Sequence, residues 1–267
     1  MPHQIIPLNV DRNVSFRDYR HIEGKKLLVA RNGLFYTFQG EGPIAGHPVV
    51  FLRLAGCNIG AKEDCPWCDT KFEFANGIEM DLFDVFERIR ILSAGRTKTI
   101  VLTGGEPLLQ KNSLEVFGKM VAAAGWTIQV ETNGYFVEYN TLPGHMIVVS
   151  PKIPHNKDTY LPYKDAWVQR KVALKYVVSA DPESKYHNLP EDVLYAKVEY
   201  DKDFPEVYVS AMCVYKRNTN PGEIPNIWDE TLVDREATAQ NYRYAAELAL
   251  KHGLRVSYQT HLFGVKE

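Results

Sequence analysis

The sequence predicts an α/β fold built on a parallel β-sheet, and three observations support this. Short apolar runs of strand length alternate with amphipathic helical stretches along most of the chain. Polar, glycine-bearing loops recur where the apolar runs end. The 267 residues, 45% of them hydrophobic, can bury one large core. Because ligands sit at the carboxyl ends of parallel strands, we expect these loops to converge on one mouth.

The composition narrows the class of protein. A formal net charge of −2 argues against a general nucleic-acid binder. No apolar run approaches the length of a membrane span, and the N-terminus lacks the pattern of a secretory signal. Three of the four cysteines are clustered, which is not a disulfide framework. We therefore expect a cytoplasmic protein whose thiols stay reduced.

The first half of the chain divides into an extension and a series of strands and helices. We read residues 1–30 as a polar N-terminal extension and residues 31–267 as the folded domain. An aromatic run then enters a glycine-rich turn at Leu34–Pro43. The elements expected after it are strands at Pro48–Leu54, Lys98–Leu102, Thr127–Val130 and Met146–Val149, and helices at Asp81–Ser93 and Ser113–Ala124, the latter capped by Ser113.

The second half continues the same alternation with less regularity. Three apolar runs predict strands at Leu174–Val178, Tyr195–Val198 and Val207–Met212. A long amphipathic stretch predicts a helix at Leu232–His252, closed by Gly253. A last strand is expected at Arg255–Tyr258.

The densest chemical signal is the segment C-N-I-G-A-K-E-D-C-P-W-C-D-T, which begins at Cys57. With Cys65 and Cys68 it offers three thiolates on one short loop, and soft thiolates indicate zinc or iron–sulfur. A structural zinc site takes four protein ligands, and no second pair follows at zinc-ribbon spacing. The remaining Cys213 lies in an apolar run, which is typical of a buried cysteine. Three ligands suit a 4Fe–4S cluster with one open iron, while a zinc knuckle or structural thiols stay open on spacing alone.

Three other features bear polar groups at strand ends. The T-G-G-E-P run is a poor phosphate loop because it lacks the lysine and spacing, but its backbone and Glu106 could receive an ammonium group. Gln39 and Glu41 form either an ordinary turn or a loop that grips a flat ligand. Arg53 interrupts a buried run, so it either pairs with a carboxylate or faces solvent at an edge.

Taken together, these motifs resemble the radical S-adenosylmethionine (SAM) superfamily. Within it, the ordered set F-Q-G-E-G, F-L-R-L-A-G-C-N, C-D-T, T-G-G-E-P, E-T-N-G, S-P-K and Q-T-H is similar to the 7-carboxy-7-deazaguanine synthase family, from about Phe35 to His261. The usual superfamily spacing is C-x₃-C-x₂-C, whereas seven residues fill the first gap here; this family is known to lengthen that loop. The resemblance implies an incomplete parallel β/α barrel of the radical SAM type over residues 31–267.

The resemblance also implies an activity. Members are radical SAM lyases that convert 6-carboxy-5,6,7,8-tetrahydropterin to 7-carboxy-7-deazaguanine and ammonia, in biosynthesis of queuosine-type 7-deazapurines. Cys57, Cys65 and Cys68 would hold three irons, and the fourth would bind SAM, which one electron cleaves to a 5′-deoxyadenosyl radical. The family further implies a flavodoxin or ferredoxin as electron donor, a homodimer, and a Mg²⁺ ion bound at Thr70 beside Asp69. A turn or helix cap is the alternative role of Asp69 and Thr70.

Residue roles follow from the matched motifs. The residues implied to bind the cofactor SAM are Gly104, Gly105, Glu106, Glu131, Asn133, Ser150 and Lys152. The residues implied to bind the substrate are Phe38, Gln39, Glu41, Arg53, Thr103 and His261. Two rival readings remain: another radical SAM enzyme, such as a glycyl-radical-activating enzyme, and a zinc-stabilised binding module without catalysis.

Overall fold

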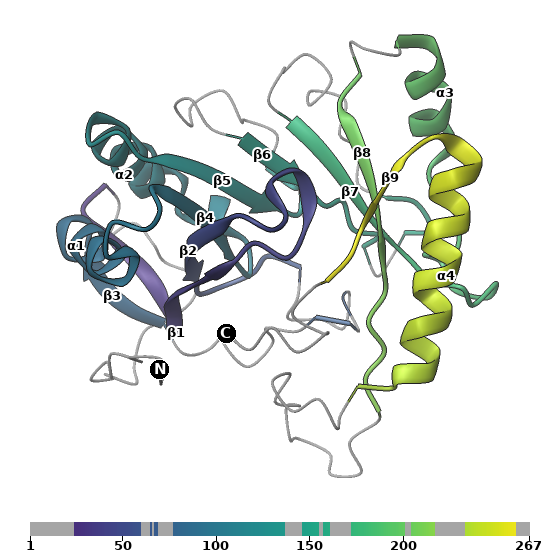
Figure 1. Ribbon diagram of the computed structural model, residues 1–267, viewed down its shortest axis with the longest axis horizontal. Helices are drawn as coiled ribbons and strands as arrows, with labels where there is room; N and C mark the ends of the chain where they lie inside the picture. Colours follow the sequence, from purple (N-terminus) through teal and green to yellow (C-terminus); the bar gives the residue numbers. More distant parts are fainter. Residues whose placement is uncertain are drawn as a thin grey trace.

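One mostly parallel β-sheet organises the chain (Figure 1). The computed structural model describes residues 24–59, 65, 67–68, 77–136, 146–154, 157–160, 172–200, 204–216 and 233–259. Within these ranges the strands are β1 (Lys26–Phe38), β2 (Pro48–Leu54), β3 (Gly77–Asp81), β4 (Thr99–Gly104), β5 (Thr127–Thr132), β6 (Met146–Val149), β7 (Val172–Val178), β8 (Glu206–Ala211) and β9 (Arg255–Ser257). The helices there are α1 (Leu82–Ser93), α2 (Lys111–Ala123), α3 (Glu191–Tyr200) and α4 (Arg235–His252), with 3₁₀ turns η1 (Gly42–Ile44) and η4 (Pro107–Gln110).

The strand order is β3-β1-β2-β4-β5-β6-β7-β8-β9. From β2 to β9 every neighbouring pair is parallel, while β1 is antiparallel to both β2 and β3. In the described part of the chain β3 and β9 lie at opposite edges, so the sheet stays open. This confirms the predicted fold, an incomplete parallel β/α barrel.

The two faces of the sheet differ in polarity. The outer face packs apolar strand residues such as Leu52, Val130 and Leu174 against the helices in one core. Cross-strand partners share a face of a sheet, and so do alternate residues along a strand. The strand registers therefore place a polar set on the inner face, beside the apolar Phe51, Val101, Val148 and Ala173. The polar set is Arg53, Thr103, Gln129, Glu131, Lys175, Tyr208, Ser210 and Ser257.

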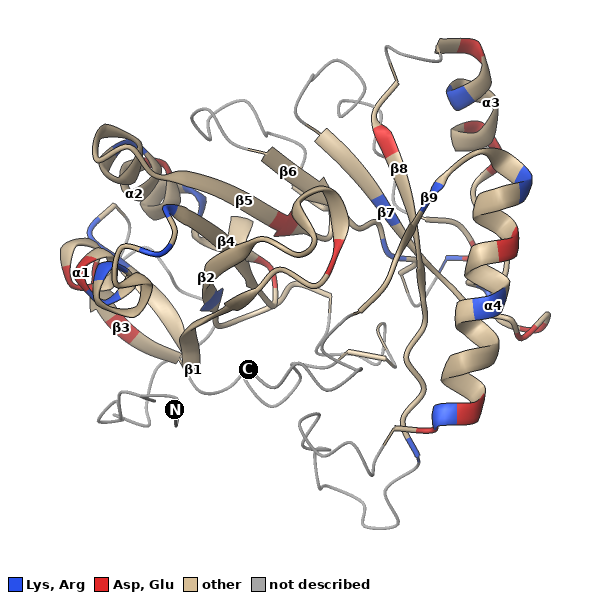
Figure 2. Ribbon diagram, viewed as in Figure 1, with Lys and Arg blue, Asp and Glu red and all other residues tan. Residues whose placement is uncertain are grey.

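The helices lie outside the sheet and show mixed charge (Figure 2). In Figure 1, α1 and α2 lie beside the first strands of the sheet, while α4 runs along β8 and β9. Between the strands of the sheet, Figure 2 shows charged positions in β5 and β7. Over the described ranges, the helices lack the length and apolar character needed to cross a membrane.

Most of the predicted elements are present, and one was wrong. Pro48–Leu54 and Met146–Val149 are strands with unchanged bounds. The strand predicted at Tyr195–Val198 is instead part of helix α3. There, Val193 and Ala196 are buried three residues apart, whereas Tyr195 is 69% exposed and Val198 is 83% exposed. The apolar residues of this segment thus lie on several sides of a helix.

Two boundaries also moved. Strand β1 begins at Lys26, so the last five residues of the range 1–30 belong to the sheet. The apolar run Leu27–Ala30 is fully buried, with β3 as its partner strand. Ser113 does not cap α2, because the helix starts at Lys111 directly after η4. Its hydroxyl instead accepts a hydrogen bond from the backbone N–H of Gly24 at 2.9 Å.

Candidate active site

The loops that follow β2, β4, β5 and β6 meet at one edge of the sheet. The backbone N–H of Glu106 donates to the carbonyl oxygen of Gly56 at 2.8 Å, which joins the loop after β4 to the start of the cysteine loop. Asn133 Nδ2 donates to Asn58 Oδ1 at 2.8 Å, and the Ser150 N–H donates to the Thr132 carbonyl at 2.7 Å. The predicted convergence at the carboxyl ends of the strands is therefore present among these residues.

Two glycines let the loop after β4 approach the cysteine loop. A Cβ at Gly104 would lie 2.0 Å from the Leu54 carbonyl oxygen, and its φ of +134° also disfavours any side chain. A Cβ at Gly105 would lie 2.1 Å from the Gly56 carbonyl oxygen and 2.7 Å from Cys57 Cβ. Both glycines are thus required by backbone packing against the end of β2, whatever else they contact.

Glu106 joins the end of β4 to the end of β5. Its side chain is fully buried, and its carboxylate accepts hydrogen bonds from Thr132 Oγ1 at 2.8 Å, the Asn133 N–H at 2.8 Å and the Leu108 N–H at 3.0 Å. Burial raises the pKa of the Glu106 carboxyl, and these three hydrogen bonds oppose the rise. Within the protein, Glu106 therefore fixes the shape of the two loops.

The three clustered cysteines follow β2, and none of them is in a disulfide. Cys65 is buried, Cys57 and Cys68 are half-buried, and the Cys68 N–H donates to the Cys65 carbonyl at 3.0 Å. Across the described ranges, no three His, Cys, Asp or Glu side chains are arranged to hold a single metal ion. A 4Fe–4S cluster does not need that arrangement, because each thiolate binds a different iron. Three reduced thiols on one loop fit such a cluster as a donor set.

The S-P-K loop after β6 carries a lysine close to the cysteines. Lys152 Nζ donates to Ser150 Oγ at 2.5 Å and to the Ser150 carbonyl at 2.9 Å. Burial lowers the pKa of the Lys152 ammonium, and the charges of Cys65 and Cys68 oppose that shift. Lys152 is thus held within electrostatic range of two of the predicted cluster ligands.

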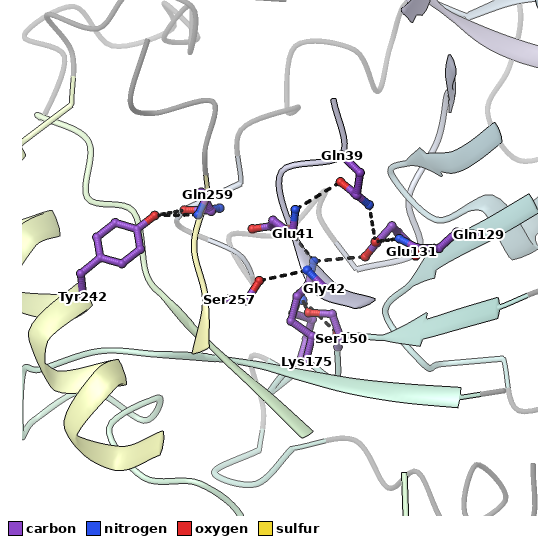
Figure 3. Close-up of polar contacts among 11 residues, drawn as sticks. Gln39, Glu41, Gly42, Gln129, Glu131, Ser150, Lys175, Tyr242, Ser257 and Gln259 are labelled. Atoms are coloured by element: carbon purple, nitrogen blue, oxygen red, sulfur yellow. Dashed lines mark hydrogen bonds and ion pairs between the residues drawn. The ribbon is translucent and has the colours of Figure 1, made fainter. Parts of the chain in front are cut away.

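A hydrogen-bonded network occupies the inner face next to this edge (Figure 3). Lys175 Nζ lies 2.6 Å from Glu41 Oε2 and 3.1 Å from Glu131 Oε2. Glu131 Oε1 accepts from Gln39 Nε2 at 3.1 Å and from Gln129 Nε2 at 2.7 Å. Burial disfavours the Lys175 cation, but Glu131 and Glu41 outweigh it, so the pKa of Lys175 is raised. The structure thus brings together Gln39, Glu41 and Glu131, which were predicted from different motifs.

The sequence left open whether Arg53 is buried or faces solvent, and the structure shows it buried. It is only 7% exposed and lies on the inner face, in register with Thr103 of β4. Its guanidinium carbon lies 5.3 Å from the centre of the Phe35 ring. Arg53 is therefore a buried inner-face cation rather than a solvent-facing edge residue. The substrate candidate Phe38, at the end of β1, is 53% exposed.

Some site residues escaped the sequence analysis, and others lie outside the described residues. Lys175 and Gln129 were missed, although a lysine inside the apolar run V-A-L-K-Y-V-V was a usable signal. The predicted metal ligand Thr70, its neighbour Asp69 and the substrate candidate His261 fall outside the described ranges. Gln259 of the same Q-T-H motif is described, and its N–H donates to the Tyr242 hydroxyl at 3.1 Å.

Comparison with known proteins identifies relatives of the chain. The family model described as the radical SAM superfamily matches residues 53–151. A 7-carboxy-7-deazaguanine synthase from Rhodospirillum rubrum is 37% identical over 161 residues, covering 59% of this chain and 61% of that protein. The crystal structure of QueE from Escherichia coli superposes with a TM-score of 0.61 at 22% identity, covering 88% of this chain and 95% of that one.

A longer match decides the family. A 7-carboxy-7-deazaguanine synthase from Rickettsia prowazekii is 32% identical over 247 residues, which is 90% of this chain and 89% of that protein. The match therefore spans the cysteine loop and the four strand ends described above. On this similarity, the chain belongs to the 7-carboxy-7-deazaguanine synthase family of radical SAM enzymes.

Proposed function

We propose that the protein converts 6-carboxy-5,6,7,8-tetrahydropterin to 7-carboxy-7-deazaguanine with release of ammonia. The observation that carries the proposal is the meeting of the cysteine loop, the three strand-end motifs and a polar inner face at one edge of the sheet. Family membership supplies the reaction class, a carbon–nitrogen lyase that uses a 4Fe–4S cluster and SAM. The product would enter 7-deazapurine biosynthesis of the queuosine type.

Cys57, Cys65 and Cys68 would hold the cluster, which leaves one iron for SAM. When bound, the cluster and SAM supply a one-electron cleavage that starts hydrogen abstraction from the substrate. The chain itself would position SAM. Gly104 and Gly105 keep the loop after β4 close to Cys57, so backbone groups can reach the methionyl end of SAM.

The loops after β4, β5 and β6 would surround the rest of the cofactor. Glu106 holds the first two loops together, so its contribution to SAM binding is chiefly to their geometry. Asn133 is anchored to Asn58 of the cysteine loop, and Lys152 is anchored to Ser150. Asn133, Ser150 and Lys152 thus offer fixed polar groups for the ribose and carboxylate of SAM.

The inner face would bind the pterin. Arg53 is the cation suited to the substrate carboxylate, because its planar fork matches a carboxylate in two hydrogen bonds. Gln39, Glu41, Phe38 and Thr103 would bind the heterocycle. We add Glu131 to this set, although its motif was assigned to SAM, because it contacts Gln39 and Lys175 on the inner face. We assign His261 to the substrate and Thr70 to a Mg²⁺ ion that holds the substrate carboxylate, since hydroxyl oxygen is a normal ligand for Mg²⁺.

Further proposals concern the cellular setting. We infer an external one-electron donor such as a flavodoxin or ferredoxin, because the cluster would have to be reduced before it could cleave SAM. We also infer a homodimer in a reducing cytoplasm. These assignments rest on family membership and on the reduced state of the cysteines.

The test is an anaerobic incubation of reduced, cluster-reconstituted protein with SAM and 6-carboxy-5,6,7,8-tetrahydropterin. Mass analysis should find 7-carboxy-7-deazaguanine and 5′-deoxyadenosine. If 5′-deoxyadenosine forms without any deazaguanine, another radical SAM activity, such as activation of a glycyl-radical enzyme, replaces this one. A colourless protein with one zinc per chain would instead favour a zinc-stabilised binding module.

A further inference from the structure

We propose that Lys175, through Glu131, sets the hydrogen-bond polarity of the pterin site, so that Gln39 and Gln129 present acceptors to a ligand edge made of N–H groups. The inference rests on the proposed function and names the part of the substrate that this site distinguishes. It makes Lys175 a positioning residue and Gln129 a specificity-determining residue of the reaction.

Glu131 is surrounded by hydrogen-bond donors. Its two carboxylate oxygens accept from three side chains at 2.7 to 3.1 Å: Gln129 Nε2, Gln39 Nε2 and Lys175 Nζ. An ionised carboxylate can only accept hydrogen bonds, whereas a protonated one carries a donor. As long as Glu131 is ionised, both glutamines must turn their NH₂ groups toward it.

Lys175 is the cation that pairs with Glu131, at 3.1 Å. It lies between Glu131 and Glu41 with only 9% of its side chain exposed. Two carboxylates this close to one another repel, and without a cation between them one would take up a proton. A second lysine, Lys152, is directed to Ser150.

The orientation of the amides has a consequence at their other ends. Each glutamine that donates to Glu131 must point its carbonyl oxygen elsewhere. Gln39 Oε1 faces the Glu41 N–H at the long distance of 3.4 Å. Gln129 Oε1 is buried and has no hydrogen-bond partner among the described residues, although Gln129 is only 1% exposed. A buried acceptor without a partner is costly, so a ligand N–H would find a favourable site there.

This polarity matches one chemical class of ligand. A pterin carries a 2-amino group next to a ring N–H, the same arrangement of donors as in a guanidinium group. A lumazine has the same ring system with an oxygen in place of the 2-amino group, so it presents an acceptor at that position. The site around Gln39 and Gln129 should therefore prefer the pterin to the lumazine, because unmatched buried acceptors are strongly penalised.

The experiment measures the affinities of the reconstituted holoenzyme with SAM, without reductant, for pterin-6-carboxylate and lumazine-6-carboxylate. The native protein should bind the pterin at least about tenfold more tightly than the lumazine. Lys175→Met should reduce this ratio at least about fivefold, since a protonated Glu131 would let an amide turn its NH₂ toward the ligand. Glu131→Gln, a neutral variant of equal size, should reduce the ratio as well.

Lys26→Met is the matched control. It removes another lysine that pairs with a glutamate, Glu79, at 3.5 Å across β1 and β3. The ratio of the two affinities should stay at the native value in this variant. An unchanged ratio in both Lys175→Met and Glu131→Gln would overturn the inference, as would equal affinities in the native protein.

A pH series adds a second readout. The titratable groups around the carboxylates are Glu41, Lys152 of the loop after β6, Lys175 of β7 and Tyr242 of α4. In Lys175→Met the two carboxylates lose the cation between them, so the preference for the pterin should be weakest at low pH and recover as the pH increases. The native ratio should stay flat over that range. A variant ratio that does not recover with pH would contradict the inference.

Different results would exclude the proposed function and the role of Lys175. If the native protein forms no deazaguanine, the proposed function fails, whatever the affinities are. If it forms deazaguanine while the variants keep the native preference, only the role of Lys175 and Gln129 is wrong.

Discussion

The hydroxyl of Thr132 donates a hydrogen bond to the carboxylate of Glu106 at 2.8 Å and so joins the ends of β4 and β5. The same hydroxyl accepts from the Gly134 N–H at 3.2 Å, which extends the contact into the E-T-N-G loop. The glutamate of the G-G-E-P motif and the threonine of the next motif are therefore one structural unit. This unit explains why two motifs that are 26 positions apart belong to the same mouth.

Thr132→Val should destabilise the fold by about 1–3 kcal/mol, because it removes a buried donor to a carboxylate while keeping the shape of the side chain. The control is Thr127→Val at the exposed start of the same strand, which should change stability by less than about 0.5 kcal/mol. Urea unfolding of both variants, monitored by circular dichroism, measures the difference. Equal effects of the two substitutions would show that the Glu106–Thr132 contact adds little.

Gly105→Ala should lower the iron content of the anaerobically reconstituted protein, because the added Cβ would force apart the Gly56 carbonyl and Cys57. Gly95→Ala is the control, since nothing lies within 4 Å of its Cβ although its φ of +76° makes it strained. That strain should cost about 1–2 kcal/mol of stability while the iron content stays native. Full iron loading in Gly105→Ala would contradict the role assigned to this close approach.

The strands of the fold could be predicted better than the interactions between them. Met146–Val149 is a short apolar run with both faces buried, so its residue types alone predict the strand. The Tyr195–Val198 prediction failed because short apolar runs do not separate a strand from a helix. The first part of β1 and all of β3 were missed because they form an antiparallel pair at one edge of the sheet, outside the strand–loop–helix repeat.

In the candidate site, too, single residues could be predicted better than the contacts between them. The cysteines, Glu106 and Gln39 stand in compact motifs, so they could be singled out by position. Lys175 could be noticed as a lysine within an apolar run, but its partners could not be predicted, because Glu41 and Glu131 are 134 and 44 positions away and the sheet brings them together.

Arg53→Met should raise KM for the carboxylated pterin about 10- to 100-fold while the affinity for SAM stays native, since methionine keeps the packing on Phe35 but loses the charged fork. The matched control is Arg96→Met. Its guanidinium stacks on Tyr36 at 4.2 Å, and consecutive residues of a strand face opposite sides of the sheet. Steady-state kinetics should show a native KM in the control. Equal changes in both variants would remove Arg53 from the substrate site.

The cysteines can be compared within one series. Cys57→Ala, Cys65→Ala and Cys68→Ala should each lose most of the iron and all turnover, with the secondary structure by circular dichroism retained. Cys213→Ala should keep both, because Cys213 is a buried residue of the core, 4% exposed. Retained turnover in any of the first three variants would remove that residue from the predicted ligand set.

The most direct test is electron paramagnetic resonance of the anaerobically reduced protein, recorded before and after addition of SAM. Three cysteine ligands leave one iron open, so we expect about four irons per chain and a cluster signal that shifts when SAM binds to that iron. A signal that SAM leaves unchanged, or a protein that contains zinc and no iron, would contradict the account.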